Sequence, residues 1–393
     1  MLLLDIGIFL CIAIVGYCYV LYPYVIRFLA ATYPEASFTN EEYLPTLSII
    51  LSVHNEEKVL ERCLKSLLEL DYPHEKVELI IGSDGSQDRT NEILARFAEA
   101  NPIIKPNYFQ DQRGKIPVLN DIVAQATGEI LFFLDADIEL SVNTLRAHVR
   151  HYANPQVGAV AGLYSLESHE TSVIYISEKE YTAFEQQIRM AESVYHATVG
   201  LAGCNYTMRR SLWRPLPDTL VHDDLFVVLS VLDQGYRIYF EPRSIASEQF
   251  GRSLMEEFWR KSRFASRGYH TLAFFRHLLL PRAGKTAFLL WSHKLARWTS
   301  PFLALLVLVL ALIGFFTYGN WLYSLILLGF SGLAVVAAIG LIAERWKKNI
   351  PLIRQASWLV VMNAAYVSGT VKYMTRTDDQ IWRSTTRVGN NDH

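Results

Sequence analysis

A run of five apolar residues, Ile130 to Leu134, ends abruptly at Asp135, Ala136 and Asp137. An unbroken apolar run of this length predicts a strand that is buried on both faces of a sheet. Two carboxylates then follow where the strand leaves the sheet, and they repel each other unless a cation compensates them. Mg²⁺ and Mn²⁺ favour such hard oxygen ligands. A solvated turn is the alternative interpretation of three such residues taken alone, because Asp is common in turns.

Short apolar runs and amphipathic segments alternate from Pro45 onward. The predicted strands are 47–53, 77–81, 107–109, 130–134 and 157–162, and the predicted helices are 59–70, 88–98 and 116–126. This βαβα order predicts an α/β domain with a mainly parallel, Rossmann-like sheet covered by helices on both faces.

Polar residues follow three of these strands. His54, Asn55 and Glu56 follow the first strand, Asp84 and Gly85 follow the second, and the Asp-Ala-Asp motif follows the fourth. Ligands of open parallel sheets bind beyond the carboxyl ends of the strands, so we expect these residues to share one crevice. The first strand is not followed by a G-x-G-x-x-G sequence, and there is no G-x-x-x-x-G-K-[ST] loop, which excludes those two nucleotide-binding motifs.

The side chains at the three strand ends suit a nucleotide-sugar. Glu56 and Asp84 are placed to accept hydrogen bonds from a uracil base or from ribose hydroxyls, and Gly85 permits a close backbone approach. Asp135 is placed to contact ribose or a metal ion, and Asp137 to bind the metal. The sequence Arg113-Gly114-Lys115 brings cations that could meet a diphosphate, although a solvated loop is the alternative for this stretch.

The chain is 51% hydrophobic and 19% charged, which predicts a soluble domain joined to a few membrane spans. Residues 6–21 are long enough to begin a span, and Arg27 after them places the next domain in the cytoplasm by the positive-inside rule. The same rule predicts that the basic turn 344–348 is cytoplasmic. Three further apolar stretches are 301–316, 321–343 and 352–374.

The last of these stretches is the weakest candidate for a span. It carries Arg354, Gln355, Asn363 and Lys372, and a charge at the bilayer centre costs about 2.5–3.5 kcal/mol on insertion scales. The stretch crosses the membrane, lines a cavity or re-enters the membrane. The tail lies outside if the stretch crosses and in the cytoplasm if it re-enters.

Basic and aromatic residues are interleaved between Arg252 and Arg297, a segment with ten Lys and Arg residues and two acids. This composition is typical of amphipathic helices lying among anionic lipid head groups. Nucleic acid is the alternative partner for such a segment. The flanking apolar stretches favour lipid, and the net charge of −2 provides no overall basic field for nucleic acid. The four cysteines form no C-x-x-C pair and predict neither a zinc site nor a disulfide framework.

Six short motifs, in this order, resemble those of the membrane-bound family 2 glycosyltransferases, such as cellulose and hyaluronan synthases and related lipid- or polysaccharide-directed enzymes. The motifs are VHNEE (53–57), SDGSQDRT (83–90), RGK (113–115), DAD (135–137), GCNYTMRR (203–210) and HDDLFVVLSVLDQGYRIYFEP (222–242). The resemblance implies a GT-A fold, a divalent metal (Mg²⁺ or Mn²⁺), a nucleotide-sugar donor that is usually a UDP-sugar, and inversion at the anomeric carbon. It also places Val53 and Asn55 with the other donor-binding residues.

The resemblance further implies that Asp224 is the general base, because Asp223 and Asp224 occupy the family's acidic pair before a helix. A carboxylate there would take the proton of the attacking hydroxyl. For Asp223, stabilisation of the helix N-terminus is an equally good interpretation.

Polymer-forming members carry Gln-x-x-Arg-Trp near the membrane. Here Arg263 matches the arginine and is implied to contact the diphosphate, but Arg260 and Phe264 replace the Gln and Trp. These departures make transfer of one or a few sugars at least as well supported as processive synthesis.

The predicted organisation is an N-terminal span (1–31), a catalytic domain (45–250), interfacial helices (251–299), a C-terminal transmembrane region (300–374) and a tail (375–393). We expect a multi-pass protein of the cell membrane with a cytoplasmic catalytic domain. Its expected function is metal-dependent transfer of a sugar to a lipid, a lipid-linked glycan or an exopolysaccharide. The alternative is a catalytically inactive nucleotide-sugar-binding protein or an export component. The sequence does not predict the sugar or the oligomeric state.

Overall fold

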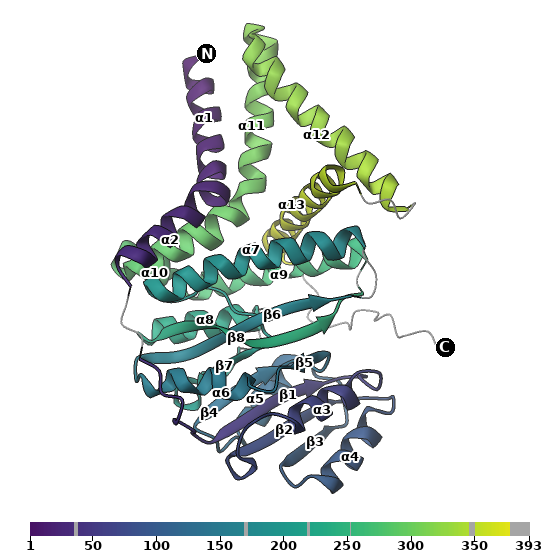
Figure 1. The fold of residues 1–393 in the computed structure, drawn as a ribbon. Coiled ribbons are helices and arrows are strands. Elements are labelled where there is room, and N and C mark those ends of the chain that lie inside the picture. The colour runs from purple at the N-terminus through teal and green to yellow at the C-terminus, as the bar shows by residue number, and fades with distance from the viewer. Residues whose placement is uncertain (35–37, 169–171, 218–220, 252, 346–349, 378–393) are drawn as a thin grey trace.

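The computed structural model describes residues 1–393 except 35–37, 169–171, 218–220, 252, 346–349 and 378–393. Most of the predicted tail and most of the basic turn at 344–348 lie outside the described residues. A sheet with its flanking helices forms one end of the molecule, two long helices cross above it, and the most apolar helices project beyond them (Figure 1).

Eight strands form one sheet, in the order β3-β2-β1-β4-β7-β6-β8-β5. Their bounds are β1 Leu47–Val53, β2 Val77–Asp84, β3 Ile104–Phe109, β4 Ile130–Leu134, β5 Ile138–Leu140, β6 Val157–Glu167, β7 Tyr206–Arg209 and β8 Arg237–Gln249. Strands β3, β2, β1 and β4 are parallel neighbours, as predicted. All five residues of β4 are buried, which confirms the strand predicted before the Asp-Ala-Asp motif.

The other half of the sheet is mixed. Strand β7 is antiparallel to both β4 and β6, β6 is parallel to β8, and β5 is antiparallel to β8. Only β6 was predicted in this half, whereas β5, β7 and the 13-residue β8 were not. Strands β7 and β5 have four and three residues, and runs this short carry almost no periodic signal.

Alternate residues of the central strands enter two separate cores. In β1, Leu47, Ile49 and Leu51 pack with one set of helices, whereas Ile50 packs with the other. The first set is α3 Leu60–Leu68, α4 Thr90–Ala100 and α6 Thr144–Val149, and the second includes α5 Lys115–Val123 and α8 Asp223–Asp233. Each large apolar side chain buried here contributes about 1.5–3 kcal/mol, so the two cores fix the positions of the strand ends.

Two long helices, α7 Val173–Tyr195 and α9 Leu254–Phe274, lie between the sheet and the apolar helices (Figure 1). Helix α9 starts where Ser253 and Glu256 form a capping box. It corresponds to the start of the predicted interfacial segment, and Trp259 and Phe274 are exposed on it. Short 3₁₀ turns lie at His74–Lys76, Arg150–Ala153, Arg210–Leu212, Arg276–Leu279 and Pro281–Ala283.

Among the described helices, three are long and apolar enough to cross a membrane: Leu2–Thr32, Lys285–Tyr318 and Trp321–Ala343. The first consists of α1 Leu2–Gly16, a π-helical segment Tyr17–Leu21 and α2 Tyr22–Thr32. The second consists of α10 Lys285–Leu289, a π-helical segment Leu290–Leu295 and α11 Ala296–Tyr318, and the third lies in α12 Trp321–Arg345.

The third predicted C-terminal stretch forms α13 Pro351–Thr375, which does not meet these criteria, so two C-terminal candidate spans are found rather than three. Helix α13 packs along α9 instead. A Cβ on Gly369 would lie 2.3 Å from the carbonyl oxygen of Ser262, and the Ser262 and Ser368 hydroxyls are 3.1 Å apart. This contact fixes α13 against α9, and whether the stretch crosses the bilayer or re-enters it stays a prediction.

Candidate active site

A cavity of about 960 Å³ opens at the carboxyl ends of β1, β2 and β4 and extends under α7, α9 and α13. Acids from three distant parts of the sequence line it: Asp84, Asp135, Asp137, Asp223 and Asp224. The predicted residues Val53, Glu56, Lys115 and Arg263 line it as well. The strand ends therefore do converge on one cavity with the acidic pair of α8.

Asp84 ends β2 and is only 3% exposed. Its carboxylate accepts hydrogen bonds from the backbone N–H groups of Arg113 (2.7 Å) and Gly114 (2.8 Å). Gly114 has a φ of +92°, a conformation that suits glycine. Asp84 therefore holds the turn that delivers Lys115 into the cavity, and its contact with a nucleotide stays a prediction.

Two of the predicted donor-binding residues, Asn55 and Gly85, are not among the residues that line the cavity. Asn55 has a φ of +54°, and its side-chain oxygen accepts a hydrogen bond from the backbone N–H of Gln87 (2.8 Å). Gly85 has a φ of +61°, and a Cβ on it would lie 2.6 Å from the backbone nitrogen of Gln112. The close approach that Gly85 permits is therefore that of the protein's own loop. The roles of both residues toward a nucleotide remain untested.

The Lys115 ammonium lies between two acids, 3.0 Å from Oδ1 of Asp135 and 3.0 Å from Oδ2 of Asp223. Burial opposes a charge on this lysine, but the carboxylates of Asp135, Asp223 and Asp224 outweigh burial and raise its pKa well above the ordinary value. Lys115 thus connects the Asp-Ala-Asp motif of β4 to the first turn of α8. This bridge was not predicted from the sequence.

Asp223 and Asp224 open α8, where acids interact favourably with the helix N-terminus. Burial raises the pKa of the Asp224 carboxyl well above its ordinary value, and the neighbouring Asp223 charge raises it further. For Asp223, burial opposes the charge, but the charge and hydrogen bond of Lys115 together with other nearby groups outweigh burial and lower the pKa. The pKa values of the two adjacent acids are therefore shifted in opposite directions. Asp223 is ionised, and Asp224 binds a proton more readily.

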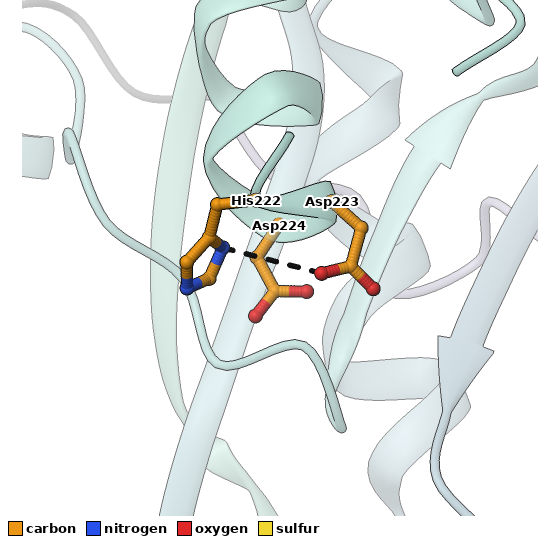
Figure 2. Close-up of side chains that lie close together, drawn as sticks. All are labelled: His222, Asp223 and Asp224. Atoms are coloured by element: carbon orange, nitrogen blue, oxygen red, sulfur yellow. Dashed lines mark ion pairs between the residues drawn. The ribbon is translucent and has the colours of Figure 1, made fainter. Parts of the chain in front are cut away.

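His222 precedes this pair and was not predicted as a site residue. Its ring points toward the two carboxylates (Figure 2), with Nδ1 4.0 Å from Oδ1 of Asp223. Burial lowers the pKa of His222 to about 4, so the ring is neutral at neutral pH. One ligand atom from each of His222, Asp223 and Asp224 lies within 4.8 Å of the others. His222 could have been predicted as a site residue from the sequence, because it directly precedes the acidic pair.

Two sets of residues could therefore hold a divalent cation. Asp135 and Asp137 are half-buried, line the cavity, and offer the oxygen ligands that Mg²⁺ and Mn²⁺ prefer. The second set is His222, Asp223 and Asp224, in which Asp223 is already paired with Lys115. The residues present thus fit a divalent metal, and Asp135 with Asp137 stays the predicted site.

Helix α9 places Arg263 and Phe264 in the cavity wall. The Phe264 ring meets the His222 ring edge to face, with centroids 4.8 Å apart. Arg260 forms two hydrogen bonds to Glu257 on the same helix, at 2.9 and 2.6 Å. The two positions that depart from Gln-x-x-Arg-Trp therefore contribute a ring beside the acidic pair and an ion pair within α9.

Gln355 and Asn363 of the stretch 352–374 line the membrane side of the cavity, one of the possibilities that the sequence left open. The sequence did not predict the partners of the neighbouring polar residues. Arg354 of α13 binds both carboxylate oxygens of Glu180 on α7, and the Trp358 ring nitrogen donates to Glu178 at 2.9 Å. Polar residues in helices near a membrane commonly face an interior or a cavity, and that was the available signal. The charge that weakened the predicted third C-terminal span is thus neutralised by α7.

The sequence matches known proteins over the catalytic part. Residues 48–214 match the model of the family described as Glycosyl transferase family 2. A probable glycosyltransferase YdaM of Bacillus subtilis is 28% identical over 245 residues, which is 58% of this chain and 56% of that protein. A poly-β-1,6-N-acetyl-D-glucosamine synthase of Staphylococcus aureus is 27% identical over 267 residues, 66% of this chain and 62% of that protein. The chain thus spans less than two thirds of the length of these curated relatives.

A solved structure of a mannosyltransferase from Pyrobaculum calidifontis, in complex with GDP-Man and Mn²⁺, superposes with a TM-score of 0.73. The sequences are 22% identical, and the match covers 95% of this chain and 100% of that one. The fold and the cavity define a protein with a GT-A domain joined to membrane helices, as predicted. Residues 48–214, the part similar to glycosyl transferase family 2, lie within this domain. The acidic pair 223–224 lies just beyond this match.

Proposed function

We propose that this protein is an inverting, metal-dependent glycosyltransferase. It would move a sugar from a nucleotide-sugar to a membrane-associated acceptor, such as a lipid, a lipid-linked glycan or an exopolysaccharide. The observation that carries the proposal is the bridge from Asp135 through Lys115 to Asp223, which joins the predicted donor end of the cavity to the acidic pair.

Asp224 is the proposed general base. Its raised pKa makes it a better proton acceptor than an ordinary carboxylate, and a base is most effective when its pKa lies near the working pH. Asp223 stays ionised and holds Lys115 in place. Asp224 would remove the proton of an acceptor hydroxyl as that oxygen attacks the anomeric carbon from the side opposite the leaving nucleotide.

Asp135 and Asp137 are the proposed metal ligands, with Mg²⁺ or Mn²⁺ as the metal. A bound divalent cation would neutralise the charge that develops on the departing nucleoside diphosphate. Lys115 lies at the same place and is a second positive charge available to that diphosphate once it is released from one of its acids. The Pyrobaculum mannosyltransferase, solved in complex with GDP-Man and Mn²⁺, supports a donor and a metal of these classes.

The similar proteins point to different donors. The family resemblance favours a UDP-sugar, the solved relative holds GDP-Man, and a curated relative is named for N-acetyl-D-glucosamine. Pocket shape, rather than any short motif, decides between sugars.

We further propose that the catalytic domain faces the cytoplasm of a cell membrane, with α7 and α9 at the membrane surface. Helix α9 carries basic residues together with exposed Met255, Trp259 and Phe274, a composition suited to the lipid interface. Residues of both helices line the cavity, so an acceptor held in the bilayer would arrive beside it.

The decisive experiment incubates the full chain in lipid nanodiscs with a panel of UDP- and GDP-sugars, each with Mn²⁺, Mg²⁺ or EDTA. We expect one donor to release its nucleoside diphosphate and to label a lipid or a glycan, only with metal. If none of the nucleotides binds in the presence of metal, the proposed function is wrong. Binding without any turnover, across a full panel of acceptors, would favour the inactive nucleotide-sugar-binding alternative.

A further inference from the structure

Two cationic side chains converge on one glycine at the membrane side of the cavity. Arg189 comes from α7, and Lys294 comes from the π-helical segment Leu290–Leu295. A Cβ placed on Gly200 would lie 2.9 Å from the Lys294 ammonium and 3.4 Å from Nε of Arg189. All three residues line the cavity. The two charges therefore lie side by side at the cavity wall, next to a residue that has no side chain.

The charges of Glu192 and Asp224 act on both cations, but neither acid forms an ion pair with them. Nε of Arg189 is buried without a hydrogen-bond partner, and among the described residues neither side chain forms an ion pair. The nearest acid on α7, Glu192, is already engaged by the hydroxyl of Tyr22 (2.6 Å) and the ring of His293 (2.7 Å).

Glu185, one turn before Arg189 on the same helix, is likewise engaged. It binds His293 through one carboxylate oxygen and Arg297 through the other.

Two like charges that are close together and shielded from bulk water repel each other and are poorly solvated. Burial accordingly lowers the pKa of Arg189. Such an arrangement is stabilised by an anion that contacts both groups, and phosphate carries enough charge to match two cations. Arginine also matches the geometry of phosphate oxygens through its planar fork of donors.

The position of the pair relative to Asp224 indicates which substrate carries the anion. The backbone N–H of Gly203 bonds to the Asp224 carboxylate, and Gly200 lies three residues earlier. Three residues span at most about 11 Å. The charge of Asp224 also acts on both Arg189 and Lys294, so the cations lie near the proposed base. The donor end, with Lys115 and Asp135, adjoins Asp223 instead. The cation pair therefore belongs to the acceptor side.

We propose that Arg189 and Lys294 bind the phosphate of a lipid-linked acceptor beside the proposed base. This inference rests on the proposed function and narrows its acceptor to a phosphorylated lipid or a glycan attached to one. The cations would anchor the phosphate while Asp224 receives the proton from the attacking hydroxyl. The lipid chain would extend from the cavity toward α11 and α13, whose residues Trp298 and Tyr366 line its membrane side.

The test measures binding to the full chain in nanodiscs, with a saturating nucleoside diphosphate and Mn²⁺ keeping the donor site filled. The probes are farnesyl phosphate, its alcohol farnesol, and inorganic phosphate. We expect farnesyl phosphate to bind at least about tenfold more tightly than farnesol, and inorganic phosphate to compete only weakly. Arg189→Gln and Lys294→Gln should each remove most of this preference, and Gly200→Ala should reduce it by filling the site.

Lys179→Gln is the matched control, because Lys179 is an exposed lysine on the same helix that does not line the cavity. Equal affinities of the wild type for farnesyl phosphate and farnesol would overturn the proposal. So would an unchanged preference in both Gln variants, or inorganic phosphate that binds as tightly as farnesyl phosphate. Donor hydrolysis is measured in parallel samples that hold a nucleotide-sugar in place of the nucleoside diphosphate. If hydrolysis persists there while the phosphate preference is absent, the proposed acceptor site is wrong and the proposed function stands.

Discussion

The Asp224 carboxylate lies against the backbone of Gly203, so closely that a Cβ on Gly203 would come within 2.1 Å of Oδ1 and 2.5 Å of Oδ2. The backbone N–H of Gly203 donates a hydrogen bond to the same carboxylate. Residue 203 must therefore be glycine for the acid to occupy this position. The loop before β7 and the first turn of α8 are thus fitted to each other at the proposed base.

Replacing Gly203 with alanine should displace Asp224. Because the neighbouring atoms include a charged carboxylate in a packed wall, we expect turnover to fall by at least about tenfold and stability to fall by about 1–3 kcal/mol. Donor binding in the presence of metal should persist. Calorimetry, thermal unfolding and turnover of Gly203→Ala measure the three effects. Gly332→Ala is the control, since a Cβ there meets nothing within 4 Å, and wild-type turnover in Gly203→Ala would contradict the fitted geometry.

The Asp224→Asn variant should bind donor and metal but lose turnover by about 10²- to 10⁴-fold, the usual contribution of a general base. The amide keeps the size of the side chain but takes no proton. Asp233→Asn, at the opposite end of α8 and outside the cavity wall, controls for effects on the helix. If Asp224→Asn turns over like the wild type, Asp224 is not the base.

The pH dependence of turnover should reveal the coupling within the acidic pair. Since Asp224 acts only when deprotonated, turnover should rise with pH through its raised pKa. Asp223→Asn removes a negative neighbour, lowers the Asp224 pKa, and should move the rising limb to lower pH. Lys115→Met removes a positive neighbour and should move it to higher pH. If the rising limb of the pH profile moves in the same direction in both variants, or does not move, the pKa of Asp224 does not set that limb.

Removing a proposed metal ligand should weaken binding of the donor only when metal is present. We expect Asp137→Ala to lower nucleotide affinity by about tenfold or more with Mn²⁺ and to have little effect in EDTA, because loss of even a supporting group near a metal costs about 10–100-fold. Isothermal calorimetry with UDP and GDP measures this difference. Asp121→Asn, on the outer side of α5, is the control. Unchanged Mn²⁺-dependent affinity in Asp137→Ala would assign the metal to other residues, with His222, Asp223 and Asp224 as the next set to test.

The membrane orientation can be measured with introduced cysteines, because all four native cysteines are buried. The turn between α11 and α12 lies beyond the two spans, near the N-terminus and away from the sheet (Figure 1). We expect a membrane-impermeant maleimide to label Asn320→Cys in intact cells, and to label Asp121→Cys only after lysis. Labelling of position 121 in intact cells would reverse the proposed orientation.

The sequence alone was sufficient for the parallel half of the sheet, the approximate positions of the spans and most of the acids in the cavity. Strand β4 and the acids after it were predicted because a run of buried apolar residues followed by carboxylates leaves few other structures available. Asp84, Asp135 and Asp137 could be placed together because parallel strands end at the same edge of a sheet. Asn55 and Gly85 follow the same strands but do not line the cavity, because their partners are a neighbouring turn and loop. Their roles toward a nucleotide stay predictions.

Local pattern carries the period of a strand or a helix, and so it determined which elements form and which residues end them. Only the tertiary structure decided which side chains meet across elements: Lys115 between Asp135 and Asp223, Gly203 against Asp224, and Arg189 beside Lys294 at Gly200. These contacts join segments that are tens to more than a hundred residues apart. Nothing in the local sequence specifies such a contact, because it depends on how whole helices pack against the sheet and against one another.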